Sequence, residues 1–159
     1  MAGAVLVTSL LAGCSPPEQQ VLAVGRDGGS GVALLFSRCT GYRVDSVSVF
    51  ADTEDSRVQS WGVSGYRVEP PVASVRLFRA PQGWRTDEAS LTVLAGGVPY
   101  RARSTGRVGD RGLDGGVSFT LEDVEGLGRD DVLVADGGEK NKVMDRDEFL
   151  AEARACSFG

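Results

Sequence analysis

Residues 117–122, with the sequence Val-Ser-Phe-Thr-Leu-Glu, alternate strictly between apolar and polar side chains. This period of two is typical of a β-strand that buries one face, because successive side chains of a strand point to opposite sides of the sheet. Residues 73–77 alternate in the same way, and Leu91, Val93 and Ala95 would line one face of another short strand. These stretches predict β-structure for the body of the chain.

Strands are also predicted over most of the sequence on either side of residues 117–122. Residues 32–36 are continuously apolar, as expected for a strand that is buried on both faces. Weaker strand candidates are residues 21–24, 44–50, 59–68, 98–103 and 132–135. Between the runs lie segments rich in Gly, Pro and Asp, which favour turns: 28–31, 69–71, 80–83, 96–97, 114–116 and 136–138. Many short strands with regular turns predict a mainly β fold, either an antiparallel β-sandwich or a small barrel.

The C-terminal residues follow a different pattern. Asp145 and Glu148 have the spacing of a helix N-cap and its capping-box partner, and Met144 and Phe149 stand where a hydrophobic staple would form. Helical spacing would place four residues on one apolar face: Phe149, Leu150, Ala153 and Cys156. We therefore predict a short C-terminal α-helix of about three turns, near the average helix length.

Composition excludes several classes of function. The chain has 159 residues, a length that suits one domain, and 42% of them are hydrophobic, which is typical of a globular protein. It has no histidine, so Ser-His-Asp and Cys-His catalysis and imidazole zinc sites are absent. Its net charge of -5 argues against nucleic acid as a partner, since such proteins need a basic surface.

The N-terminal segment has the features of an export signal. Residues 1–13 are mostly apolar and carry no Asp, Glu, Lys or Arg, although a signal peptide normally opens with a basic residue. The run is too short to span a membrane, which takes about 20 apolar residues. Leu11, Ala12, Gly13 and Cys14 resemble the lipobox of bacterial lipoproteins, and the sequence as a whole is loosely similar to small actinobacterial lipoproteins. The alternative is a buried N-terminal strand with an ordinary cysteine.

The resemblance to lipoproteins implies a division of the chain and a location. Residues 1–13 would be a signal peptide that is removed, and residues 14–20 a lipid anchor on Cys14 followed by a proline-containing tether. Residues 21–159 would be a single extracytoplasmic β-rich domain. The protein would be exported and held by its lipid on the outer face of the cell membrane.

Export bears on the two remaining cysteines, Cys39 and Cys156. Disulfides persist outside the cytoplasm, and two cysteines remain once Cys14 has its own role. We expect a Cys39–Cys156 bridge, which by chain entropy would stabilise the domain by about 4–5 kcal/mol. The alternative is two buried, unpaired thiols.

Arginines gather at Arg101, Arg103, Arg107 and Arg111. Arg101 and Arg103 would lie on one face of a strand, where they could contact an anion or a lipid headgroup, because guanidinium groups bind phosphate and carboxylate in a bidentate manner. The simpler interpretation is a solvated strand face paired with nearby acids. The glycines around Arg107 and Arg111 favour a loop there.

Two further residue classes suggest sites that we do not favour. Acidic residues cluster at Asp52, Glu54 and Asp55, but no segment has EF-hand spacing, so turns and surface are the favoured interpretation and no metal site is expected. The aromatic residues could stack on a sugar, but core positions are more common for them. Trp84, which follows Pro81-Gln82-Gly83, is the one we expect to be exposed.

No catalytic residues can be assembled from the sequence. Asp130 and Asp131 are adjacent, so on a strand they would face opposite ways, and no glycine-rich phosphate loop is present. We expect no cofactor. The function expected is a membrane-anchored binding or structural module of the cell envelope, with an envelope protein as a further partner. The alternatives are a small envelope hydrolase that uses carboxylates, or a small-ligand receptor.

Overall fold

The computed structural model describes residues 20–37, 39, 41–53, 58–137 and 140–152. In chain order the elements are β1 (Leu22–Arg26), β2 (Val32–Phe36), β3 (Tyr42–Ala51), β4 (Ser60–Ser64), β5 (Ser74–Arg76), β6 (Arg85–Ala89), β7 (Tyr100–Val108), β8 (Arg111–Phe119), α1 (Leu121–Glu125), β9 (Asp131–Ala135), β10 (Asn141–Asp145) and α2 (Arg146–Glu152).

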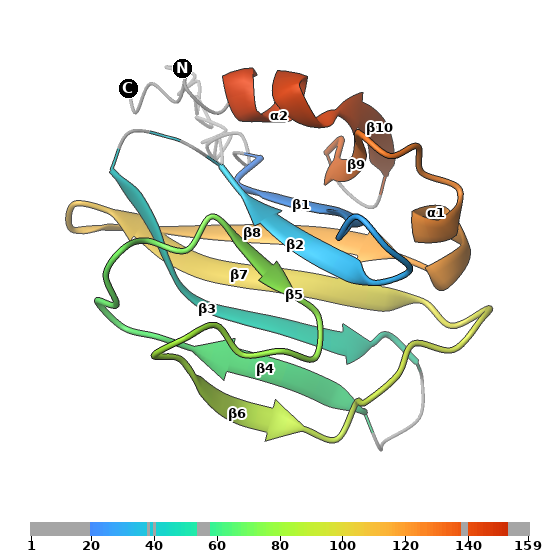
Figure 1. Cartoon of the computed structure of the whole chain (residues 1–159), viewed down its shortest axis with the longest axis horizontal. Coiled ribbons are helices and arrows are strands. Elements are labelled where there is room, and N and C mark those ends of the chain that lie inside the picture. The colour runs from blue at the N-terminus through green and yellow to red at the C-terminus, as the bar shows by residue number, and fades with distance from the viewer. Residues whose placement is uncertain (1–19, 38, 40, 54–57, 138–139, 153–159) are drawn as a thin grey trace, which may run out of the picture.

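The strands form two antiparallel sheets that pack face to face (Figure 1). The first sheet has the order β10-β9-β1-β2-β5, and the second has the order β6-β4-β3-β7-β8. The prediction of a mainly β, antiparallel sandwich with a C-terminal helix is confirmed. The alternative of a small closed barrel is wrong, because the strands pair into two separate sheets rather than one continuous ring.

The first sheet is covered on both faces. Its inner side chains, among them Leu22 and Leu34, join the core shared with the second sheet. On its outer face Leu35 and Val132 pack with Phe149, which α2 lays over the sheet. Continuous burial of β2 follows from this, and it confirms the prediction for residues 32–36.

Helix α2 begins as its sequence predicts. Asp145 accepts hydrogen bonds from the backbone N–H groups of Asp147 and Glu148, at 2.8 and 3.1 Å. Met144 and Phe149 are buried in one cluster on the first sheet. The described part of the helix ends at Glu152, so Ala153 and Cys156 lie outside the described residues.

The strand predicted over residues 117–122 ends earlier, at Phe119. Thr120 caps helix α1 instead: its hydroxyl accepts a hydrogen bond from the Asp123 N–H, and the Asp123 carboxylate accepts one from the Thr120 N–H. This reciprocal pair satisfies two backbone donors at the helix start. The alternation of apolar and polar residues continues into α1, although the chain is helical there.

The turn predicted at residues 114–116 is also wrong, because these residues lie inside β8. The chain turns instead at Gly109, whose φ of 58° favours glycine. Gly115 faces the first sheet so closely that an added Cβ would lie 2.7 Å from the Leu22 Cβ. Glycine here permits close contact between the two sheets.

One further strand prediction differs from the structure, and two strands were missed. Residues 91–95 form a loop rather than a strand: Leu91 is buried, but Val93 of the predicted face is 69% exposed and Leu94 is buried in its place. The neighbouring strand is β6, which the sequence did not reveal because all five of its residues are exposed. Strand β10 was missed as well, since Met144 is its one buried residue.

Candidate binding face

The outer face of the second sheet is open in the part of the chain that the structure describes. Helix α2 packs on β9 and β10, and α1 packs against β1, so neither helix covers it (Figure 1). We call this surface the open face and define it by the outward side chains of β4, β3, β7 and β8. Those used below are Arg43, Asp45, Ser46, Phe50, Ser64, Arg101, Arg103, Thr105, Arg107 and Asp114.

Strand β7 brings three arginines to the open face. Tyr100, Ala102 and Ser104 are buried, and the alternating residues Arg101, Arg103 and Arg107 point outward. The prediction that Arg101 and Arg103 share one strand face is therefore confirmed. The loop predicted near Arg107 and Arg111 is shorter than expected, because β7 continues to Val108 and β8 begins at Arg111, which leaves a turn at Gly109 and Asp110.

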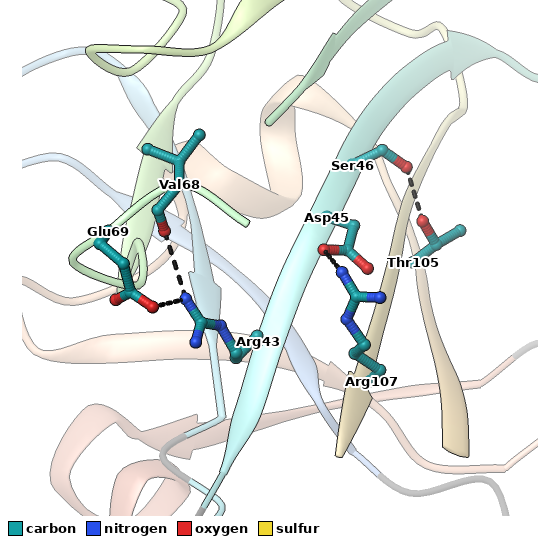
Figure 2. Close-up of polar contacts among 7 residues, drawn as sticks. All are labelled: Arg43, Asp45, Ser46, Val68, Glu69, Thr105 and Arg107. Atoms are coloured by element: carbon teal, nitrogen blue, oxygen red, sulfur yellow. Dashed lines mark hydrogen bonds and ion pairs between the residues drawn. The ribbon is translucent and has the colours of Figure 1, made fainter. Parts of the chain in front are cut away.

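Some of the cations on the open face are neutralised by neighbouring carboxylates. Figure 2 shows Arg107 of β7 donating to Asp45 of β3, with 2.9 Å between Nη2 and Oδ1. Figure 2 also shows Arg43 contacting the Glu69 carboxylate and the Val68 carbonyl. Both pairs are partly solvated, so each contributes at most about 1 kcal/mol to stability.

Arg101 and Arg103 differ from these two arginines. Neither forms an ion pair with any described residue. The Arg103 guanidinium lies 5.3 Å from the centre of the Phe50 ring, which orients it without cancelling its charge. The Arg101 Nε is buried and has no hydrogen-bond partner within the described chain. These two side chains keep their charge for a ligand.

The two arginines line a hollow of about 350 Å³, which we call the arginine hollow. Its other lining residues are Ser104, Thr105, Asp114, Gly115 and Gly116. Gly116 stands opposite Arg103 on the paired strand and leaves the space above β8 unfilled. The hollow therefore offers two guanidinium groups, a hydroxyl and one carboxylate.

A second hollow of about 470 Å³ lies on the other side of β3, and we call it the tyrosine hollow. It is lined by Asp45, Ser46, Ser64, Gly65, Tyr66, Val68, Gly83 and Arg85. Its polar groups are mostly hydroxyls, and Arg85 is already paired with Asp87 at 2.8 Å. Its chemistry is thus more neutral than that of the arginine hollow.

The tyrosine hollow contains an exposed aromatic ring. Tyr66 is 62% exposed, whereas Trp84 is 9% exposed and belongs to the core. The prediction that Trp84 is the exposed aromatic is therefore wrong. Gly65 lies so close to the Trp84 ring that an added Cβ would fall 2.4 Å from it, and this contact closes the loop over the Trp84 ring. The guanidinium groups of Arg107 and Arg67 lie 4.2 and 5.1 Å from the Tyr66 ring centre.

These arginines change the acidity of Tyr66. Hydrogen bonding from Arg107 lowers the pKa of Tyr66 below its ordinary value of 10.0, and the charges of Arg107 and then Arg67 act in the same direction. Because Asp45 holds Arg107, the ring, the guanidinium and the carboxylate form one connected group. That group fixes the exposed ring at the edge of the tyrosine hollow.

The two hollows meet at one hydrogen bond. Ser46 lines the tyrosine hollow and Thr105 lines the arginine hollow, and their hydroxyl oxygens are 2.6 Å apart (Figure 2). Ser46 is placed outward by the β-bulge between Val44 and Ser46 in β3. The hollows are therefore neighbours across the β3–β7 pair.

The cysteine predictions fall mostly outside the described residues. Cys14 and Cys156 are among the residues that the structure does not describe. Cys39 is 4% exposed, and its Sγ lies 2.8 Å from the Ser37 Oγ. No described helix is long and apolar enough to cross a membrane.

The acidic residues do not gather in the described structure. Of the acidic cluster predicted near residue 52, Glu54 and Asp55 lie outside the described residues. Within the described ranges no three residues of His, Cys, Asp or Glu stand close enough to hold a metal ion together. Hydrogen bonds from its own backbone N–H and then from that of Gly97 lower the pKa of Glu122.

A scan against protein-family models and searches of curated proteins and of solved structures find no match for this chain.

The sequence pattern predicts the arginines of the open face but not the residues around the tyrosine hollow. Tyr66 was assigned to the core, and Asp45 and Ser46 were not singled out. The signal for Ser46 was the pair Asp45-Ser46, which breaks the alternation of β3 and marks the bulge.

Proposed function

We propose that this chain is an exported lipoprotein that acts as a binding module of the bacterial cell envelope, with the open face as its ligand surface. Acylation of Cys14 would hold it on the outer face of the membrane, and residues 15–20 would be the tether. This proposal joins the lipobox of the sequence to the geometry of the second sheet.

The observation that carries the binding role is the layer order of the fold. The first sheet is enclosed between α2 and the second sheet, while the second sheet leaves its outer face uncovered by any described helix. On that uncovered face Arg101 and Arg103 have no carboxylate partner among the described side chains, although the chain carries a net charge of -5. Unpaired guanidinium groups in a hollow support anion recognition.

A Cys39–Cys156 disulfide belongs to the same proposal. Cys39 is buried at the end of the first sheet, and Cys156 follows α2, which packs on that sheet. A bridge would hold the chain beyond α2 against the domain. Alkylation of the protein unfolded in denaturant without a reductant is expected to leave both cysteines unmodified, and labelling of both would refute the bridge.

The anchor is tested by the variant Cys14→Ser in a host that processes lipoproteins. The wild-type chain is expected in the membrane fraction, with processing that globomycin blocks. The variant is expected to remain unprocessed and to incorporate no labelled fatty acid. If the variant is processed and acylated like the wild type, Cys14 is not the anchor.

The ligand surface is tested by retention on isolated cell envelopes. We expect Arg101→Gln with Arg103→Gln to weaken binding by more than tenfold, because a charge-assisted hydrogen bond contributes about 1.5–3 kcal/mol and tenfold in affinity is about 1.4 kcal/mol. Arg129→Gln removes an exposed charge from the loop before β9 and serves as the matched control. Equal loss in both variants would indicate unspecific charge attraction.

No observation of the described structure favours the small envelope hydrolase. A carboxylate acid–base pair needs one carboxyl with a raised pKa, and the pKa of Glu122 is lowered instead. Asp145 and Asp123 are engaged in capping helices.

A further inference from the structure

The two hollows of the open face present different chemistry side by side. The arginine hollow offers the guanidinium groups of Arg101 and Arg103, which suit a carboxylate or a phosphate. The tyrosine hollow offers an exposed ring beside hydroxyls and the Asp45 carboxylate. A ligand that fills both must carry negative charge at one point and an apolar, hydroxylated surface at the next.

Polar lining with an exposed aromatic ring is the chemistry that recognises a sugar. Arg107 and Arg67 cover part of the Tyr66 ring, and the apolar surface that stays exposed on this 62% exposed residue can stack against a pyranose face. Ser46 and Ser64 provide hydroxyls, and Asp45 accepts hydrogen bonds from sugar hydroxyls. Arg107 holds both Tyr66 and Asp45 in place, so the group is ordered before a ligand arrives.

The distance between the hollows requires an extended ligand. The arginine hollow lies over β7 and β8, and the tyrosine hollow lies over β3, β4 and the start of β6. Strands are about 4.8 Å apart, so the hollow centres are separated by about 10 Å. One small ion cannot contact both, whereas a chain that crosses the strands can.

A phospholipid surface fits the open face less well. A continuous anionic membrane surface would bring negative charge against both Asp45 and Asp114, which stand in the two hollows, whereas a glycan can present hydroxyls to these carboxylates. Except for Tyr66, the exposed large apolar residues of the described chain do not line either hollow. An ionised group flanked by hydroxyls instead matches a mixed lining of arginine, serine and aspartate.

We propose that the open face binds an acidic polysaccharide that crosses the strands, with an acid group of the glycan on Arg101 and Arg103 and a sugar ring on Tyr66. The proposal rests on the proposed function, of which it names the ligand class. The Ser46–Thr105 pair lies beneath the point where the glycan passes from one hollow to the other.

The probes for the test are polygalacturonate and a phosphomannan, with dextran as the neutral sugar and polyglutamate as the polyanion without rings. The protein is the full chain with Cys14→Ser, which removes the proposed acylation. We expect binding to at least one acidic glycan, at least tenfold tighter than to dextran or polyglutamate. Equal binding of polyglutamate, or no binding of either acidic glycan, would overturn the proposal.

Matched variants locate the site. A Cβ on Gly116 would lie 3.9 Å from the Arg101 Nη2, an ordinary contact, so the position accepts a side chain and Gly116→Val narrows the arginine hollow. Gly112→Val is its control, since Gly112 is on the same strand and face with open space around it. We expect at least a tenfold loss for Gly116→Val and Tyr66→Ala, and little change for Gly112→Val.

Thermal melts confirm that each variant folds. Further outcomes separate the proposal of a binding module from the proposal of an acidic polysaccharide as its ligand. If Gly116→Val misfolds, Arg103→Gln replaces it, because Arg103 is exposed. Unchanged glycan binding in Gly116→Val or Arg103→Gln and in Tyr66→Ala refutes the assigned site. Binding to phosphatidylglycerol vesicles without glycan binding refutes the ligand class but leaves the binding module intact. Binding to neither probe nor cell envelopes refutes both.

Discussion

Tyr66 is the residue whose setting is most informative. Its ring is exposed, yet hydrogen bonding and positive charge from Arg107 lower its pKa. We predict that Arg107→Gln raises the pKa of Tyr66 back toward 10.0, because the hydrogen bond from Arg107 that mainly lowers this pKa is removed. Ultraviolet titration of the wild type and the variant measures this, with Tyr66→Phe identifying the signal. An unchanged titration would show that Arg107 does not contact the phenol.

Tyr42 has the opposite setting. Burial raises its pKa above 10.0, the nearby Ser104 offsets part of the rise, and its hydroxyl has no well-formed hydrogen bond within the described structure. Above pH 10 the unfolded chain loses this proton while the folded chain keeps it, so the free energy of unfolding falls as pH rises. Below pH 10 that contribution is fully present.

Replacing Tyr42 removes this dependence. We predict that Tyr42→Phe flattens the loss of stability above pH 10 and leaves the stability at pH 7 unchanged or raised by about 1 kcal/mol, since a buried hydroxyl without a hydrogen bond costs free energy in the folded state. Urea unfolding at pH 7 and at high pH compares the variant with the wild type. A parallel decline in both proteins would contradict the assignment to Tyr42.

At the scale of elements, α2 depends on its cap. Asp145 accepts two backbone hydrogen bonds at the helix start, and the helix positions Phe149 on the first sheet. We predict that Asp145→Ala lowers the free energy of unfolding by about 1 kcal/mol. Asp145→Asn retains an acceptor and is expected to lose a smaller amount. Equal losses in urea unfolding would indicate that charge rather than the hydrogen bonds stabilises this end.

The elements also show what sequence patterns can and cannot predict. Strand β2 was predictable because burial on both faces requires a continuous run of apolar residues. Helix α2 was predictable because its N-cap requires a particular residue type at its first position. Strand β6 left none, because its stability comes from pairing with β4 rather than from buried side chains. The glycines of β8 resembled a turn, but at Gly115 the small residue serves contact between sheets, which only the packed fold reveals.

In the whole molecule, the open face is exposed because of how the sheets and helices are layered. Alternation in β7 predicted that Arg101 and Arg103 share a face, but not which face the fold leaves open. That depended on α2 covering the first sheet and on β3 pairing with β7, contacts between residues far apart in the chain. The meeting of Ser46 with Thr105, 59 residues later, has the same origin.

The most direct test of the binding face is amide chemical-shift mapping of the labelled chain carrying Cys14→Ser, titrated with soluble fragments of its own cell envelope. The open face predicts shifts that cluster in β3, β7 and β8, around Ser46, Thr105 and Gly116, and that disappear in Arg101→Gln with Arg103→Gln. Shifts confined to α2, β9 and β10, or shifts that persist in the double variant, would contradict it.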